Sequence, residues 1–376
     1  MSGPSRRSFL TSMAAAGIAA PWLRSASAQE PTKPKPQKIL VLGGTGFLGP
    51  HFVRAALANG HTVTLFNRGK TNPGLFAELE QLRGDREQGD LAALQGRTFD
   101  AILDTSGYVP AHVDATAQRF AGSAQHYLFV SSISVYSAFG DSAGTIDESA
   151  AVGTVADEDV AKVSTIRQSL PFYGPMKARC EAAAEAAMPG RVANVRPGLI
   201  VGPGDPSDRF TYWPWRIDQG GEVLAPGPAD GLVQFVDVRD LAAWLLHCIE
   251  QRIVGVYNAT GFRGTVSMGD LLAACKCATE QAVELVWVDE PFLAAEKVGA
   301  WMELPLWLPS TGRTRLDVQR ALAAGLRCRP VADTVRDTLQ WAKSERGDQP
   351  FAKTGLRPER ERELLAKWRA RAAAGR

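Results

Sequence analysis

The sequence predicts an α/β fold in which a doubly wound parallel sheet carries a small C-terminal lobe. Short, apolar segments alternate with helical segments along the chain, and a glycine-rich loop, residues 43–49, follows the first of them. Two later segments, 209–231 and 301–309, are instead rich in Trp, Pro and Gly. Short apolar runs are typical of strands covered on both faces, and their alternation with helices is the pattern of repeated βαβ units.

Five segments carry the strand pattern. In chain order they are residues 38–42, 61–66, 99–103, 127–130 and 192–196. The first is a continuous apolar run that leads into the glycine-rich loop, and Asn67-Arg68-Gly69 turns the chain away after the second. Because helical segments or turns separate these strands, we expect them to pair in parallel.

Five further segments are predicted to be helical. They are residues 52–58, which Asn59-Gly60 ends, 110–121, 173–187, an apolar helix within 236–250, and the charged tail helix 357–371. The tail helix has Leu364, Leu365 and Trp368 on one side, so we expect it to pack on the body of the protein. The polar, acidic segment 141–169 is expected to be a surface excursion.

The glycine-rich loop is expected to hold a dinucleotide. Backbone there must pass close to a pyrophosphate, and free N–H groups at the start of the next helix face its negative charge. Its position between a buried strand and a helix predicts a Rossmann-type domain that binds NAD or NADP. The loop residues expected to contact the dinucleotide are Gly43, Thr45, Gly46, Phe47, Leu48 and Gly49.

Composition places the chain among ordinary globular proteins. Its 376 residues are 45% hydrophobic and 22% charged, with a formal net charge of +2. A near-neutral balance gives no reason to expect binding to nucleic acid or to an acidic membrane surface. The five cysteines are scattered and no cluster of ligands completes a metal site, so we expect mostly buried structural cysteines and no metal.

The first residues have the pattern of an export signal. Arg6-Arg7 precedes Phe9-Leu10, a short apolar stretch over 13–23 and the small-x-small site Ala26-Ser27-Ala28. This order predicts a twin-arginine signal peptide, and therefore a periplasmic or secreted protein without a stable membrane span. We accordingly divide the chain into the signal at 1–28, a Pro/Lys-rich linker at 29–37, the NAD(P)-binding domain at 38–200, and a substrate lobe with returning sheet elements and the C-terminal helix at 201–376.

Two further segments carry side chains suited to acid–base chemistry. Tyr173 and Lys177 are four residues apart in a predicted helix and so share one face. A neighbouring ammonium stabilises a phenolate, so we expect the pKa of Tyr173 to fall from about 10 toward the range of a general acid–base. Ser132 follows the strand 127–130, at the edge where such sheets bind ligands, and is expected to hydrogen-bond a substrate oxygen. Taken alone, either feature also fits a plain helix face or a simple turn.

Jointly, these features resemble the extended branch of the short-chain dehydrogenase/reductase superfamily, the NAD-dependent epimerase/dehydratase family. The resemblance spans almost the whole chain after the signal. It also rests on Gly84-Asp85-Arg86, 196–198, 202–205, 235–238, 329–330 and 338–341. It implies that Ser132, Tyr173 and Lys177 form the catalytic triad. It further implies that Asp85 lies near the adenine and that Lys177 also holds the nicotinamide ribose.

Two departures from the family pattern bear on the chemistry. Sugar dehydratases of the family carry an Asp-Glu pair just after the catalytic hydroxyl, whereas this chain has Ile133 and Ser134, which argues against dehydration. The second strand usually ends in a carboxylate that binds the NAD ribose, but here Asn67 and Arg68 follow it, with Lys70 nearby. A guanidinium suits a 2′-phosphate, so NADP is favoured and NAD is the alternative.

The loop 43–49 and the turn 67–69 are also similar to chloroplast stem-loop RNA-binding proteins and to the isoflavone-reductase-like branch of this fold. This similarity offers a non-catalytic RNA- or ligand-binding protein as an alternative. The near-neutral charge and the retained Tyr173 and Lys177 argue against it, so no nucleic-acid partner is expected.

The substrate is expected to contact the lobe through the segment 208–216. Arginines and aromatic rings over the active site suit a polar ring such as a sugar, through stacking and bidentate hydrogen bonds. The expected contacts are Arg209, Trp213 and Arg216. The alternative is that the tryptophans form the core of the lobe.

The predicted export favours one type of reaction. A net reductase must exchange its dinucleotide after every turnover, whereas an epimerase removes a hydride and returns it, so one retained cofactor serves repeatedly. We therefore expect a self-recycling, epimerase-like oxidoreductase acting on a secondary alcohol or ketone of a carbohydrate. A conventional NADPH-dependent reductase of a small carbonyl compound is the alternative, and a homodimer is left open.

Overall fold

The computed structural model describes residues 35–139, 144–261, 265–312, 314–351 and 353–374. The twin-arginine signal predicted at residues 1–28 therefore lies outside the described residues. In the described part of the chain, the helices are all too short or too polar to cross a membrane.

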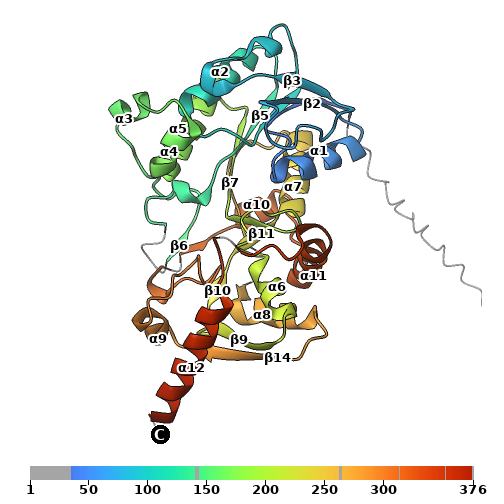
Figure 1. Ribbon diagram of the computed structural model, residues 1–376. Helices are drawn as coiled ribbons and strands as arrows, with labels where there is room; N and C mark the ends of the chain where they lie inside the picture. The colour runs from blue at the N-terminus through green and yellow to red at the C-terminus, as the bar shows by residue number, and fades with distance from the viewer. Residues whose placement is uncertain (1–34, 140–143, 262–264, 313, 352, 375–376) are drawn as a thin grey trace, which may run out of the picture. The chain divides into compact units, whose positions relative to one another are not determined.

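Within the described residues, seven parallel strands form the main sheet, in the order β12-β7-β5-β4-β1-β2-β3 (Figure 1). The strands are β1 (Lys38–Leu42), β2 (Thr62–Asn67), β3 (Glu80–Arg83), β4 (Ala101–Asp104), β5 (His126–Val130), β7 (Val192–Pro197) and β12 (Gly255–Ala259). The five predicted strands and their parallel pairing are confirmed, with small shifts at their ends. Sequence reasoning missed β3, in which only Leu82 is buried, and β12, in which Gly255 and Asn258 interrupt the apolar run.

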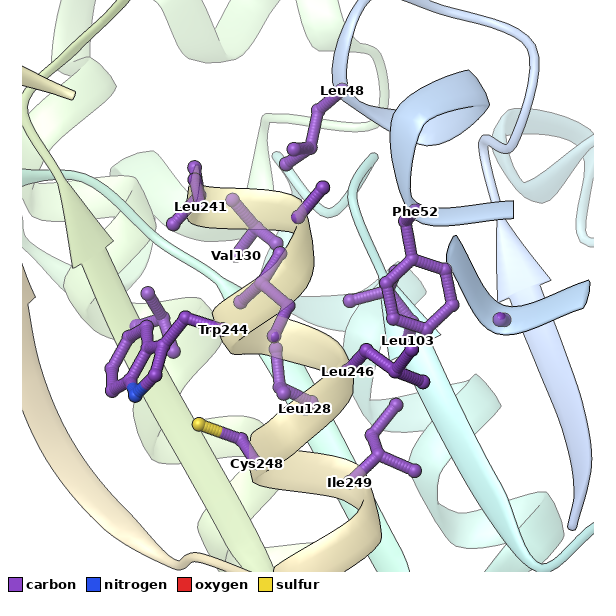
Figure 2. Packing of buried hydrophobic residues seen from close by; sticks show 14 of the residues in the cluster. Leu48, Phe52, Leu103, Leu128, Val130, Leu241, Trp244, Leu246, Cys248 and Ile249 are labelled. Atoms are coloured by element: carbon purple, nitrogen blue, oxygen red, sulfur yellow. The ribbon is translucent and has the colours of Figure 1, made fainter. Parts of the chain in front are cut away.

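Helices cover both faces of this sheet. On one face, α1 (Leu48–Ala58) and α7 (Val238–Gln251) pack their apolar sides against alternate strand residues, and Figure 2 shows Phe52, Trp244 and Ile249 in this layer. On the other face lie α2 (Pro110–Phe120) and α5 (Tyr173–Ala187). Because successive strand side chains point to opposite faces, a continuous apolar strand supplies both layers at once.

The strand order reverses beside β1, which lies between β2 and β4. Parallel strands end at the same edge of the sheet, so the glycine loop after β1 and Ser132 after β5 come to one side of the sheet. A crevice at such a reversal is where doubly wound folds bind their ligands.

A second hydrophobic core forms the lobe. Its elements are α6 (Tyr212–Asp218), β9 (Gly221–Pro226), α8 (Met268–Cys277), β14 (Val283–Val288), α9 (Glu290–Ala295), α11 (Val331–Trp341) and α12 (Pro358–Ala374). Strands β9 and β14 pair in parallel. Leu364 and Leu365 of α12 are buried and Trp368 packs on Phe292, so the expected packing of the tail helix is confirmed.

The remaining elements are short. They are β6 (Thr145–Ile146), α3 (Asp157–Ala161), α4 (Ile166–Ser169), β8 (Leu199–Val201), β10 (Leu232–Val233), β11 (Phe235–Asp237), β13 (Val266–Ser267), β15 (Arg315–Leu316) and α10 (Gln319–Ala323). The helix expected within 236–250 begins only at Val238, because Phe235–Asp237 pairs with β8 and the Asp237 carboxylate then caps α7 by accepting from the N–H of Arg239. Cys180, Cys248 and Cys275 are buried as expected, whereas Cys277 is exposed.

Candidate active site

One large cavity of about 1330 Å³ lies at the carboxyl edge of the sheet and continues against the lobe. It is lined by thirteen of the fifteen residues predicted for the site. They are Gly43, Thr45, Gly46, Phe47, Leu48, Gly49, Asn67, Arg68, Asp85, Ser132, Tyr173, Lys177 and Arg209. The fold thus brings the predicted dinucleotide loop and the predicted triad to one cavity.

The glycine loop has the backbone shape that its sequence requires. Gly43 has φ +89°, and a Cβ there would lie 2.7 Å from Oγ1 of Thr105, so only glycine fits. A Cβ on Gly49 would collide with the backbone of Gly44, which lets α1 start tightly against the loop. The side chain of Phe47 does not cap α1, so the first N–H groups of this helix remain available to an anion in the cavity.

The end of β2 carries an amide and a guanidinium where a carboxylate is usual. The Oδ1 of Asn67 accepts from the N–H of Gly69 at 2.9 Å and from Arg83, while its buried Nδ2 has no hydrogen-bond partner. Arg68 lies at the rim with 40% of its side chain exposed, 3.9 Å from the carboxylate of Glu87. Neither side chain offers a carboxylate to a ribose hydroxyl, and the guanidinium of Arg68 suits a phosphorylated ribose better than a plain one.

Asp85 lines the cavity, but its carboxylate hydrogen-bonds the backbone two residues further on. It accepts a hydrogen bond from the N–H of Glu87 at 3.1 Å and so caps the short helix η1 (Arg86–Gln88). Glu87, which sequence reasoning missed, lies near Arg68 through one carboxylate oxygen. Its other oxygen accepts from the N–H of Ile166 at 2.9 Å. The loop after β3 is thereby tied to the segment that leads into α5.

A buried ion pair that sequence reasoning also missed joins Arg86, which lines the cavity, to Asp104. Arg86 donates two hydrogen bonds to Asp104 at 2.7 and 3.0 Å and a third to Ser106 at 2.8 Å. Tyr127 donates to the same carboxylate at 2.9 Å. Burial alone would raise the pKa of Asp104, but the guanidinium of Arg86 and these hydrogen bonds hold that pKa below its usual value. The pair fixes the residues after β3 to those after β4.

Tyr173 begins α5 and meets Ser132, which precedes the short helix η3 (Ile133–Val135). The hydroxyl of Ser132 lies close enough to the phenol of Tyr173 to lower its pKa, and the Oγ of Ser132 accepts from the N–H of Ser134 at 3.1 Å. This contact depends on Gly174, because a Cβ there would overlap the carbonyl oxygen of Ser134. A glycine directly after the tyrosine was therefore a signal for the close approach, and sequence reasoning did not use it.

The pKa of Tyr173 departs from the expected direction. Burial raises it above the usual value, and this outweighs the nearby hydroxyl of Ser132 and the positive charge of Arg209, which both lower it. The expectation of a lowered pKa is therefore wrong in this structure. The cation whose charge acts on the phenol is Arg209 of the lobe, not Lys177.

Lys177 is engaged elsewhere on the cavity wall. Its Nζ donates to the carbonyl oxygen of Val130 at 2.8 Å and lies over the rings of Tyr108 and Phe129, 4.4 and 4.8 Å from their centroids. Burial lowers the pKa of Lys177 to about 8. The ring of Tyr108 lies 6.3 Å from that of Tyr173, so two phenols flank the predicted reaction centre.

Of the three predicted substrate contacts, only Arg209 lines the cavity. Trp213 is fully buried in the lobe, where its indole N–H donates to the carbonyl oxygen of Pro305 at 2.7 Å. Arg216 pairs with Glu361 of α12 at 2.6 Å and donates to the backbone oxygen of Glu222. The prediction for Trp213 and Arg216 is corrected: they stabilise the lobe, which was the alternative for the tryptophan.

Known proteins are similar to this chain in sequence or in fold. The chloroplast stem-loop binding protein of 41 kDa b from Arabidopsis thaliana is 24% identical over 256 residues, which cover 64% of this chain and 62% of that protein, so the chain spans less than two thirds of that relative. The dTDP-6-deoxy-L-talose 4-dehydrogenase (NAD(P)(+)) of Kitasatospora kifunensis is 30% identical over 251 residues, covering 61% of this chain and 76% of that enzyme.

Among solved structures, the UDP-glucuronic acid 4-epimerase of Bacillus cereus in complex with NAD superimposes with a TM-score of 0.60 at 15% identity, covering 84% of this chain and 99% of that one. This similarity shows the fold. The sequence model of the NAD dependent epimerase/dehydratase family matches residues 39–259, which is more than half of the chain. By that match, the protein belongs to the NAD dependent epimerase/dehydratase family, whose members bind NAD or NADP.

Proposed function

We propose that the protein is an NAD(P)-dependent, epimerase-like oxidoreductase that transfers hydride at a secondary alcohol or ketone of a sugar-like substrate. The observation that carries this proposal is that Tyr173 and Ser132 share the wall of the cavity that the glycine loop also lines, with the Ser132 hydroxyl close enough to lower the pKa of the phenol. Hydride chemistry needs a proton to move at the substrate oxygen, and these two hydroxyls offer a donor and an orienting partner there. The proposal is tested by the Tyr173 variant described in the Discussion.

The cavity fits a dinucleotide on three counts. The glycines of the loop from Gly43 to Gly49 allow its backbone to approach a pyrophosphate, and the uncapped start of α1 adds free N–H groups. The partly exposed guanidinium of Arg68 offers donors at the end of β2. When bound, the nicotinamide supplies the acceptor and donor of hydride.

In the proposed reaction, Tyr173 takes the proton of the substrate hydroxyl and returns it, while the hydroxyl of Ser132 holds the same oxygen. Burial raises the pKa of Tyr173, so the resting phenol is protonated near neutral pH and can donate directly to a ketone, whereas it must first release this proton to solvent before it can take one from an alcohol. Lys177, fixed by the carbonyl oxygen of Val130, is assigned to the ribose next to the nicotinamide. Ile133 and Ser134 bring no acid–base pair after Ser132, which argues against dehydration.

The dinucleotide is proposed to be NADP, and Arg68→Asp tests this. We expect the variant to lose its preference for NADP and to bind NAD equally or more tightly, because a carboxylate repels a 2′-phosphate and accepts from a ribose hydroxyl. The measurement is the ratio of the dissociation constants of NADP and NAD by calorimetry. Arg97→Asp is the matched control, since Arg97 is exposed, pairs with Glu80 and lies outside the cavity lining. An unchanged ratio in Arg68→Asp would mean that Arg68 does not read the phosphate.

Retention of the dinucleotide is the second part of the proposal and rests on the predicted export. A protein that leaves the cytoplasm folded and loaded can use one cofactor repeatedly only if the hydride it removes is returned. We expect protein purified without added nucleotide, then denatured and examined by chromatography, to release nearly one NADP or NAD per chain. Empty protein that binds NADPH weakly would contradict retention and favour an ordinary reductase.

A net NADPH-dependent reductase is the second candidate, because Arg68 and Asn67 replace the usual carboxylate. The relative from Kitasatospora kifunensis, a 4-dehydrogenase by name, is consistent with such chemistry. Steady consumption of added NADPH with a carbonyl substrate would establish this candidate and remove the self-recycling one. Empty protein that binds neither dinucleotide would instead favour RNA or ligand binding, to which the similarity to the chloroplast stem-loop binding protein points.

A further inference from the structure

Arg209 differs from the other cations of the cavity in how it is held. Its Nε donates to the hydroxyl of Ser207 at 3.1 Å, and its guanidinium lies over the ring of Trp301, 5.7 Å from the ring centroid. Among the residues that the structure describes, none accepts a hydrogen bond from its two terminal nitrogens. The guanidinium is thus oriented through its Nε, while its two terminal nitrogens have no acceptor among the described residues.

The acidic residues beside Arg209 do not neutralise it by direct contact. Asp208 binds Arg346 through both oxygens, at 2.9 and 3.1 Å. Asp205 is buried and accepts from the N–H and the hydroxyl of Ser207 at 2.8 and 2.9 Å, so Ser207 stands between this carboxylate and the guanidinium. Neither carboxylate of this loop forms an ion pair with Arg209.

Three other basic groups on the cavity wall are engaged, while Lys70 and Arg315 are exposed to solvent. Arg86 is held by Asp104, Lys177 donates to the carbonyl oxygen of Val130, and Arg68 lies beside Glu87 at the rim. Arg209 lies close enough to Tyr173 for each charge to affect the other's pKa. A partly buried guanidinium without a counter-charge is costly, and an anionic ligand offsets that cost through paired, charge-assisted hydrogen bonds.

We infer that Arg209 binds an oxyanion of the substrate, a carboxylate or a phosphate, at the reacting end of the cavity next to Tyr173. This inference rests on the proposed function and narrows its substrate to an acidic sugar or a sugar phosphate whose charged group lies near the carbon that exchanges hydride. Arg209 is then the residue that selects such substrates over neutral sugars, since a neutral group would leave the guanidinium unpaired.

Two small anions test the inference without knowledge of the full substrate. Malonate and inorganic phosphate are titrated by calorimetry into protein saturated with NADP, so that the dinucleotide already occupies its own phosphate sites. At least one anion is expected to bind saturably, and the stronger of the two identifies the group as carboxylate or phosphate. In Arg209→Met the affinity should fall by about tenfold to a hundredfold, as for the loss of a charged hydrogen-bond donor.

Matched variants separate this site from general charge. Arg315→Met removes another arginine of the cavity wall and is expected to bind the anion as the wild type does. Binding that is absent in the wild type, unchanged in Arg209→Met, or weakened equally by Arg315→Met would overturn the inference. Tyr173→Phe should keep the anion affinity. If Tyr173→Phe loses turnover while anion binding does not depend on Arg209, only the inference about Arg209 is rejected. If Tyr173→Phe keeps its turnover, only the acid–base role of Tyr173 is rejected.

Discussion

Tyr173→Phe is expected to lower turnover by about 100- to 10,000-fold, the usual contribution of a positioned acid–base group. The phenol lies beside the hydroxyl of Ser132, and removing its oxygen leaves no proton at the place where the substrate oxygen is expected. The ring itself remains beside that of Tyr108, 6.3 Å away, so the wall of the cavity keeps its shape. Affinity for the dinucleotide should consequently stay close to that of the wild type.

The measurement separates chemistry from binding. Sugars, sugar acids and sugar phosphates are screened for reduction of the dinucleotide bound to the wild type, which reports the first hydride transfer even if the hydride later returns. The rate of that reduction is then compared in Tyr173→Phe, alongside the dissociation constant of NADP. Tyr257→Phe is the control, since this hydroxyl donates to the carbonyl oxygen of Val254, outside the cavity. Full activity in Tyr173→Phe would remove Tyr173 from the proposed mechanism.

The main sheet and the dinucleotide loop were predictable because their signals are local. A strand such as Lys38–Leu42, buried on both faces after its exposed first residue, must be apolar over its buried part, and the turn after it needs glycine wherever φ is positive or backbones touch. Tyr173 and Ser132 were found for a related reason, since each stands at a fixed place relative to a strand end or a helix start. Patterns within a few residues were sufficient to predict the sheet and the loop and to select Tyr173 and Ser132 as candidates.

The orientation of α6 was not predictable in the same way. Arg209, Trp213 and Arg216 lie within eight residues of sequence, yet only the first reaches the cavity. What decides this is Pro305, which accepts from the indole of Trp213, and Glu361, which pairs with Arg216. Both partners are far away in the chain, and a short segment contains no information about them.

The predicted direction of the pKa shift of Tyr173 was wrong for a comparable reason. Four-residue spacing places Lys177 on the same helix face, but the carbonyl oxygen of Val130 and the rings of Tyr108 and Phe129 hold its ammonium. The charge that acts on the phenol comes from Arg209, on a loop of the lobe. Spacing along one helix therefore identified the residues but not the electrostatics between them.

The ion pair of Arg86 and Asp104 leads to the second large expected effect. Arg86→Leu should lower the free energy of unfolding by about 3–5 kcal/mol near neutral pH, because it leaves a buried carboxylate without its counter-charge. Asp104 is fully buried and would keep only the hydrogen bonds from Tyr127 and from Ser106. Urea denaturation of wild type and variant at matched nucleotide content measures the difference.

The dependence on pH follows from the direction of the shift. In the wild type the pKa of Asp104 is lowered, so the pair contributes stability above the carboxyl group's unfolded pKa, and this contribution is lost as pH falls through the folded pKa. In Arg86→Leu, burial without the guanidinium should raise that pKa, and protonation then relieves the buried charge. The deficit of the variant should accordingly shrink as pH falls from about 7 to about 5.

The double variant Arg86→Leu/Asp104→Leu distinguishes a lost interaction from a stranded charge. Replacing both partners of a buried pair by apolar side chains is often neutral, whereas removing one is not. We expect the double variant to recover most of the stability that Arg86→Leu loses. The difference in unfolding free energy between the double variant and the wild type should not shrink as pH falls. A double variant as unstable as the single one would mean that the Arg86 side chain stabilises the fold through packing and its bond to Ser106, rather than by neutralising Asp104.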